Sequence, residues 1–194
     1  MRRLVLVVTA LLLLTACIGD PMNDKDQDDS TPSPTARSQS DGVEVWDLRV
    51  SPSAAAFGIP DDSNAGIYES EEPRSVRFEL PQGRTLTMEA TLVSFHRSGE
   101  GDAARFTVGM RSDQVPPAAI VTTYRDVLEQ LDLGPETVDE LDREIAAAPD
   151  DQTERISVAS PELTLDDLKL GAQAGLAPVA RSGRVIVGGS WQQR

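Results

Sequence analysis

Apolar side chains recur at every second position in four segments of the chain, residues 43–50, 74–80, 85–95 and 106–110. A period of two predicts β-strands that bury one face and expose the other. In the third segment the apolar positions move by one place at Val93, which predicts a β-bulge. Between the first two segments, residues 51–73 are rich in proline, glycine and acids. We expect an irregular stretch there, with a helical turn near Ala54–Phe57.

After Pro116 and Pro117 the period of the apolar positions changes to about 3.6, which predicts helices. Gly134-Pro135 separates two helices, and Pro149 ends the second one. Their apolar stripes consist of Ile120, Val121, Tyr124, Val127, Leu128 and Leu131 in the first helix, and of Val138, Leu141 and Ile145 in the second.

Strand patterns return towards the end of the chain. Ile156 and Val158 predict one strand, and residues 184–191 predict the last one. Residues 164–176 fit either a short helix capped at Thr164 or a strand. Strands followed by helices and again by strands predict an α+β fold, in which an antiparallel β-meander sheet carries a helical hairpin packed on one face.

The first residues of the chain have a different pattern. Residues 4–14 are apolar except for Thr9, and the basic residues Arg2 and Arg3 precede them. As a helix this run would extend roughly 16 Å, about half of the ~30 Å hydrocarbon core of a membrane. It therefore predicts a cleaved signal peptide, residues 1–16, and not a membrane-spanning helix.

Leu14-Thr15-Ala16-Cys17 follows this run and resembles the lipobox of bacterial lipoproteins. The resemblance covers the leader only, and no family is recognised for the rest of the chain. It implies that the Cys17 thiol receives a diacylglycerol group with acyl chains such as palmitate, and that a signal peptidase cleaves between Ala16 and Cys17. The alternative is an ordinary secretory leader with an incidental cysteine. At ~0.8 kcal/mol per buried methylene, two acyl chains hold a protein on a membrane without a spanning segment.

Residues 17–42 lack apolar periodicity and are rich in aspartate, serine, threonine and proline. Such a composition cannot offset the entropy of ordering, so we expect a disordered acidic tether that begins at the lipidated cysteine. A flexible chain of this length reaches roughly 25–30 Å. Residues 43–194 are then expected to form one globular domain on the extracytoplasmic face of the cell membrane. In a cell with an inner and an outer membrane, the sequence leaves open which of the two membranes carries the protein.

Acidic residues outnumber basic ones by 32 to 18, and the net charge is −14. Loss of Arg2 and Arg3 with the leader leaves 16 basic residues and a net charge of −16. Such a surface repels phosphate backbones and anionic headgroups, so we expect no nucleic-acid partner. The basic residues are arginine except for Lys25 and Lys169, a preference typical of GC-rich genomes such as those of actinobacteria.

The residues that nucleophilic catalysis needs are scarce. Cys17, the only cysteine, cannot form a disulfide within the chain and is predicted to be lipidated. The only histidine, His96, is expected in an exposed turn, where a solvated role is the simpler interpretation. The sequence has no Gly-x-Ser-x-Gly elbow and no Ser-x-x-Lys pair, and Gly188-Gly189-Ser190 lacks the helix that a phosphate-binding loop requires. We therefore expect no catalytic residue.

We expect no metal and no cofactor either. One histidine and no free thiol exclude the usual zinc sites. Asp24, Asp26 and Asp28 are spaced like the first ligands of a calcium loop, but the glycine and glutamate that complete an EF-hand are absent. Asp150-Asp151 and Asp166-Asp167 stay open as carboxylate calcium sites, although solvated loop charge is the simpler interpretation.

The sequence also predicts where the two tryptophans and the acidic residues of the helices lie. Trp46 and Trp191 lie near the two ends of the predicted domain, where they either pack in the core, the simpler case, or form an exposed patch. The acidic residues of the predicted helices lie on their non-core side, which is a solvated face or a surface for a basic partner. These acids are Asp126, Glu129, Asp132, Glu136, Asp139, Glu140 and Glu144.

The sequence thus favours a membrane-anchored lipoprotein of the cell envelope with a non-catalytic binding or interaction domain. Its partner is expected to be an envelope protein or a lipid, and its oligomeric state stays open. The main alternative is a carrier that holds a lipid or another small apolar ligand in a cavity between sheet and helices. An enzyme is the third option, since carboxylate pairs leave no sequence motif.

Overall fold

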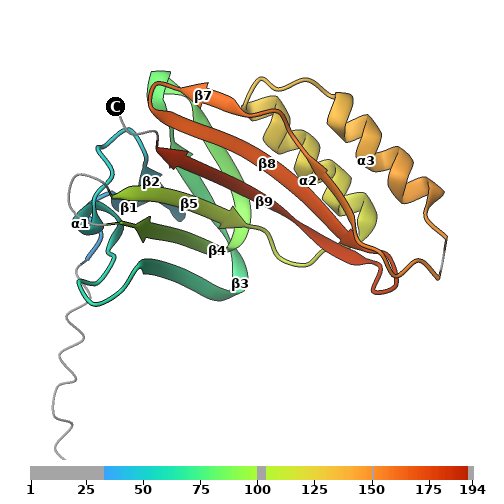
Figure 1. The fold of residues 1–194 in the computed structure, drawn as a ribbon, viewed down its shortest axis with the longest axis horizontal. Helices are drawn as coiled ribbons and strands as arrows, with labels where there is room; N and C mark the ends of the chain where they lie inside the picture. Colours follow the sequence, from blue (N-terminus) through green and yellow to red (C-terminus); the bar gives the residue numbers. More distant parts are fainter. Residues whose placement is uncertain (1–32, 100–103, 150, 192–194) are drawn as a thin grey trace, which may run out of the picture. The chain divides into compact units, whose positions relative to one another are not determined.

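The computed structural model describes residues 33–99, 104–149 and 151–191 (Figure 1). The predicted lipidation of Cys17 and cleavage after Ala16 lie outside these ranges. Most of the expected tether and Asp150 also lie outside them. Within the described ranges, no helix has the length and hydropathy that crossing a membrane requires.

The described residues include nine strands that form one sheet. The strands are β1 (Arg37–Ser40), β2 (Val43–Asp47), β3 (Ala65–Glu79), β4 (Thr85–Ser98), β5 (Arg105–Arg111), β6 (Ile156–Ala159), β7 (Leu163–Leu165), β8 (Leu168–Ala177) and β9 (Ser182–Trp191). Their order in the sheet is β1-β2-β3-β4-β5-β9-β8-β6, and β7 pairs with β8 outside this path. All pairs are antiparallel except β2–β3, which is parallel.

In the part of the chain that the structure describes, three α-helices accompany the sheet, α1 (Ala54–Phe57), α2 (Pro117–Gln130) and α3 (Glu136–Ala147), and a 3-10 turn, η1 (Pro81–Gly83), joins β3 to β4. The Ser53 hydroxyl accepts a hydrogen bond from the Ala56 backbone and starts α1, and Gly58 ends it in the left-handed conformation. Helix α2 packs against β4, β8 and β9, whereas α3 contacts α2 and β6 (Figure 1). The α+β class is confirmed, and the helical turn and both longer helices lie where their patterns predicted them.

One face of the sheet, which we call the inner face, carries the buried positions of the strands. In β8, and in β9 as far as Val187, these alternate with more exposed residues. Helix α2 covers this face: Ile120, Tyr124 and Leu128 are buried on it, and a Cβ atom added to Gly183 of β9 would lie 2.8 Å from Cδ1 of Ile120. The inner positions are Leu168, Leu170, Ala172, Ala174 and Leu176 of β8, with Val185, Val187 and Trp191 of β9.

A chain of aromatic rings fills the part of the core under α1. Trp46 lies 4.6 Å from Phe95, Phe95 stacks on Phe57 at 4.2 Å, and Phe57 lies 5.2 Å from Trp191, measured between ring centroids. Trp46 and Trp191 are therefore core residues, although β2 and β9 are not neighbours and the rings do not pack on each other. Phe57, from the short helix α1, thus links Phe95 of β4 to Trp191 of β9.

Two expected boundaries were wrong, and one alternative that the sequence left open is decided in favour of a strand. Strand β1 pairs with β2 and lies inside the expected tether, so ordered structure begins before Val43. Strand β3 starts at Ala65, within the stretch expected to be irregular. Residues 164–176, which fitted a helix or a strand, form parts of β7 and β8. In each case pairing with a neighbouring strand outweighs the local composition.

The predicted bulge is present but lies earlier than expected. In β4, Ala90 and Thr91 are both buried, and the pairing of β4 with β3 shifts between Glu69 and Arg74. The buried side of β4 thus changes at Thr91 and not at Val93. Leu92, expected to point inward, is only half-buried.

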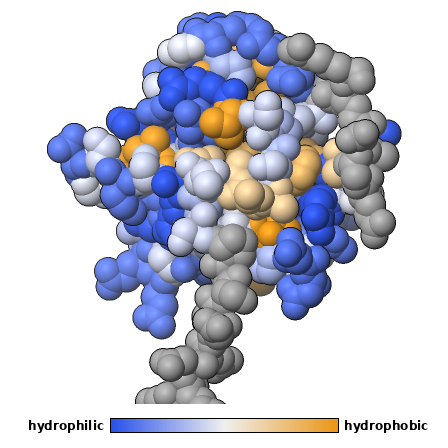
Figure 2. Space-filling view, turned by 90° about the vertical axis from the view of Figure 1, so that its left-hand side faces the viewer, coloured by the Kyte–Doolittle hydropathy of each residue, from blue (hydrophilic) through white to orange (hydrophobic). Residues whose placement is uncertain are grey.

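The end of the molecule that carries α1 shows an apolar area surrounded by hydrophilic residues (Figure 2). Ala55 of α1 is exposed. Val50, which the alternation of residues 43–50 placed inward, is 37% exposed because β2 ends at Asp47. The alternation of residues 43–50 therefore extends three residues beyond the end of β2.

We predict that Phe57→Ala lowers the free energy of unfolding by about 3–5 kcal/mol, the usual cost of removing a buried aromatic ring. The ring contacts both halves of the aromatic chain, so the cavity would separate Phe95 from Trp191. Denaturant unfolding of the two proteins measures the difference. Val179→Ala, at a position that is 63% exposed, should change stability little. An equal loss in both variants would contradict the central role of Phe57.

Candidate functional site

The residues singled out by sequence do not form a common site. His96 lies within β4, opposite Thr107 and exposed, and not in the turn where it was expected. Asp166 and Asp167 form the turn between β7 and β8, where an Asp166 oxygen accepts a hydrogen bond from Gln82. Gly188-Gly189-Ser190 lies inside β9. In the described ranges, no three His, Cys, Asp or Glu side chains are placed to hold a metal ion.

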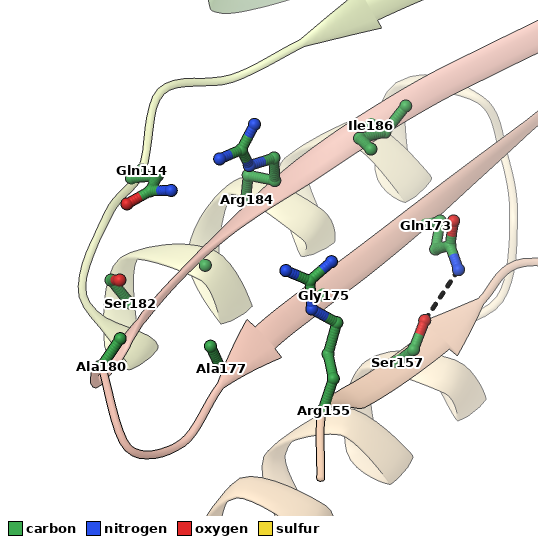
Figure 3. Close-up of a pocket in the computed structure, with 11 residues that line it drawn as sticks. Gln114, Arg155, Ser157, Gln173, Gly175, Ala177, Ala180, Ser182, Arg184 and Ile186 are labelled. Carbon is green, nitrogen blue, oxygen red and sulfur yellow. Dashed lines mark hydrogen bonds between the residues drawn. The ribbon is translucent and has the colours of Figure 1, made fainter. Parts of the chain in front are cut away.

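A hollow of about 150 Å³ lies on the outer face of the sheet, opposite α2 (Figure 3). We call it the arginine pocket, because Arg155 and Arg184 both line it. Figure 3 shows Arg155 extending toward Gly175 of β8, with Arg184 on the neighbouring strand β9. The polar side chains around the pocket are Gln114, Arg155, Ser157, Gln173, Ser182 and Arg184.

Strand alternation brings these side chains together. Arg184 is paired with Gly175, and Gly175 is paired with Ser157 of β6, so the three positions form one row across the sheet. Since Gly175 has no side chain, the middle of the row is hollow. A Cβ atom at Gly175 would meet nothing nearer than the Ile156 carbonyl oxygen at 3.9 Å, so the space above this glycine is open. Glycine inside a strand often marks a close approach by another group.

The segment that follows β5 closes one side of the pocket. Val115 and Gly183 exchange two backbone hydrogen bonds of 2.8 and 3.0 Å, which attach this segment to β9. The buried Ser112 hydroxyl accepts a hydrogen bond of 2.9 Å from the Val185 backbone N–H. Gln114 lies between Ser112 and Val115 and is thereby held beside Arg184.

Neither arginine of the pocket is neutralised by another described residue. The side chains of Arg155 and Arg184 make no hydrogen bond or ion pair within the described ranges. Arg49, Arg84 and Arg111, by contrast, each bind a carboxylate at 3.1 Å or less, whereas Arg105, Arg125 and Arg143 have no such partner among the described residues but lie outside the pocket. Arg184 is also half-buried, so its charge is partly removed from water.

The chemistry of the pocket is that of an anion receptor. Two guanidinium groups offer planar pairs of N–H donors that match carboxylate and phosphate oxygens. The Gln114 amide adds further donors and acceptors, whereas the Gln173 amide already donates to the Ser157 hydroxyl at 2.7 Å. The pocket lining contains no carboxylate, thiol or imidazole. It therefore suits binding of an anion better than acid–base or nucleophilic chemistry.

A second charged cluster, around the buried Glu44, is structural. One carboxylate oxygen accepts hydrogen bonds from Arg37 at 2.8 Å and Arg74 at 2.9 Å, and the other accepts one from the Trp46 indole at 2.7 Å. The Arg37 guanidinium also lies over the Trp46 and Tyr68 rings. The charged atoms of Glu44 are thus fully occupied, and the cluster links β1, β2 and β3.

Burial alone would raise the pKa of Glu44, but hydrogen bonds from Arg74, Arg37 and Trp46 outweigh it. The net effect holds the pKa of this carboxyl below its ordinary value of 4.5. Burial also raises the pKa of the Tyr68 hydroxyl, which donates to the Phe57 carbonyl oxygen at 2.9 Å.

Sequence reasoning did not find the arginine pocket. Arg155, Gln173 and Arg184 are scattered over the last third of the chain and look like solvated strand positions. The one feature of the sequence that could have indicated the pocket is the polar and glycine-containing set of outward positions in β8 and β9. Recognising it required the pairing of β6, β8 and β9.

No protein-family model, no curated protein and no solved structure matches this chain.

We predict that the stability of the protein falls as the pH drops below about 4.5, in part because Glu44 must take up a proton. Its folded pKa is lowered, so its contribution is present above the unfolded pKa and is lost as the pH falls through the folded pKa. Glu44→Gln should be less stable at neutral pH and lose less stability on acidification. Denaturant unfolding between pH 3 and 7, on the order of the carboxyl range, measures both effects. Parallel pH curves for the two proteins would contradict this assignment.

Proposed function

We propose that this protein is a membrane-anchored lipoprotein of the cell envelope whose domain binds an anionic ligand in the arginine pocket without catalysing a reaction. One observation carries the ligand class: two arginines without a described carboxylate partner meet at one hollow of a strongly acidic protein. A carboxylate or phosphate group is the natural counter-ion for such a pair.

The proposed anchor rests on the leader. The apolar run, its basic start and Leu14-Thr15-Ala16-Cys17 support lipidation and export. A domain tethered to a membrane meets other envelope components at a raised effective concentration. Weak binding at an open pocket is then sufficient for capture. The proposed location is the extracytoplasmic face of the cell membrane.

We predict that Cys17→Ala abolishes both lipidation and cleavage at this site, because the thiol is the acceptor of the diacylglyceryl group. Intact-mass measurement of protein from membranes should show the acylated mature chain for the natural sequence and an unprocessed leader for the variant. A mature variant that starts at residue 17 would contradict the lipobox interpretation.

We predict that the mature lipidated protein, in a neutral detergent, binds inorganic phosphate or acetate, and that Arg184→Gln and Arg155→Gln each weaken this binding about tenfold or more. Hydrogen bonds to charged groups contribute about 1.5–3 kcal/mol, and 1.4 kcal/mol corresponds to tenfold in affinity. Titration followed by NMR or calorimetry measures the constants.

Arg143→Gln is the matched control, since this exposed arginine of α3 lies outside the pocket and its loss changes the net charge equally. Its effect should be about twofold or less, the size expected of a remote surface charge. Equal weakening in all three variants would indicate a general charge effect and would oppose the pocket as the binding site.

A second candidate function is a carrier of a small apolar ligand. A groove of about 320 Å³ lies between α2 and β4, with Met88, Val115 and Val127 in its lining. We propose for this case that α2 and α3 form a helical hairpin on one face of the sheet that moves away to admit the ligand. Glu89, Asp113 and Asp126 also line the groove and disfavour anionic lipids. Native mass spectrometry distinguishes the two functions, because a carrier should retain a co-purifying lipid.

A further inference from the structure

We infer that the arginine pocket is one end of a longer dipolar groove, and that its ligand is a short peptide with a free amino end and a free carboxyl end. This inference rests on the proposed function and names the ligand class for the same site. It follows from a neighbouring hollow, from the order of charges across the sheet and from the distance between them.

A second hollow of about 290 Å³ adjoins the arginine pocket on the outer face. Gln114 and Arg184 line both hollows, so the two lie side by side at these residues. The second hollow extends over β3 and the end of β5, where Glu69, Ser70 and Arg111 contribute to it. A ligand in the arginine pocket that extends past Gln114 and Arg184 would reach the second hollow over β3.

The sign of the charge reverses along this groove. The arginine pocket contains Arg155 and Arg184 and no carboxylate. The second hollow contains the carboxylates of Glu69, Glu71 and Asp113. Its own Arg111 donates to Glu69 at 3.1 Å and so neutralises one of them. Glu71 and Asp113 remain for a cation in the second hollow, where Arg184 forms the border with the arginine pocket, and Arg155 and Arg184 face an anion in that pocket.

The pairing of the strands sets the distance between the two ends. Glu69, Leu92, Arg111 and Ile186 form one row from β3 to β9 on the outer face. Neighbouring strands lie about 4.8 Å apart, so β3 and β9 are roughly 14 Å apart across three spacings. Asp113, which follows β5, is only about one spacing from β9. A cation bound among these carboxylates thus lies roughly 5–14 Å from an anion bound at Arg184.

This separation selects among zwitterions. A single amino acid holds its charges closer than one strand spacing, whereas extended peptides add about 3.3–3.6 Å per residue. Peptides of about two to four residues therefore span the groove. Gln114, at the junction of the two hollows, can bond to peptide groups of the ligand, and the exposed Ile186 offers apolar surface for its side chains.

The test uses the mature lipidated protein in neutral detergent and tri-alanine as the probe. Tri-alanine with free ends should bind, and both N-acetyl-tri-alanine and tri-alanine amide should bind about tenfold more weakly or worse, since each lacks one charge. Phosphoethanolamine tests the other source of a linked anion and ammonium group, a lipid headgroup. Calorimetry or NMR titration gives the affinities.

Variants assign the two ends. Asp113→Asn combined with Glu71→Gln should remove the preference for the free amino end and should not weaken the binding of N-acetyl-tri-alanine, because the loss of acids beside Arg184 favours a bound carboxylate. Asp142→Asn, an exposed acid of α3, is the matched control and should retain the preference. Gly175→Val fills the arginine pocket where a Cβ atom has room, and should weaken every probe without unfolding the domain.

The outcomes separate the inference from the function beneath it. Equal affinity for tri-alanine and its N-acetyl form, with phosphate still bound, would overturn the dipolar groove and leave the anion pocket intact. Tighter binding of phosphoethanolamine than of tri-alanine would overturn the peptide as the ligand. Failure of phosphate, acetate and tri-alanine alike to bind would overturn both proposals. Loss of affinity on blocking either peptide end supports the inference.

Discussion

The inner face of the sheet carries rows of apolar side chains, and the fold depends on keeping these rows out of water. Two elements accomplish this. Helix α2 places Ile120, Tyr124 and Leu128 against β8 and β9, and the short helix α1 inserts Phe57 between Phe95 and Trp191. Because the chain has a single cysteine, no disulfide within it supports this packing. Side-chain burial and strand pairing must supply the stability.

Burial of one face leaves the other face free to bind. The same alternation that points Val185 and Val187 to α2 points Arg184 and Ile186 outward. Gly175 and Ser157 continue the row across β8 and β6, and the segment after β5 adds Gln114. The arginine pocket thus follows from one-sided burial in three neighbouring strands, and Arg155 before β6, the turn between β8 and β9 and the segment after β5 complete it.

The distribution of charges on the outer face indicates which kind of ligand this face can bind. The acidic surplus of the chain favours solubility and repels anions in general. The arginine pocket differs locally, because two arginines without a described acidic partner line one hollow there. Glu44, by contrast, binds Arg37, Arg74 and Trp46 with all its oxygen atoms, so its cluster holds β1, β2 and β3 together and has no atom left for a ligand.

Sequence periodicity by itself determined the α+β class, the two long helices, the turn at Ala54–Phe57 and most strands, because each of these depends on a local pattern of burial. It missed β1 and the strand character of residues 65–73, where pairing with β2 and β4 overrides composition. Tertiary structure alone decided that Trp46 and Trp191 meet through Phe57 and Phe95, and that Arg155, Arg184 and Gln114 share one hollow. Strand order and register bring distant residues together, and no local pattern contains that information.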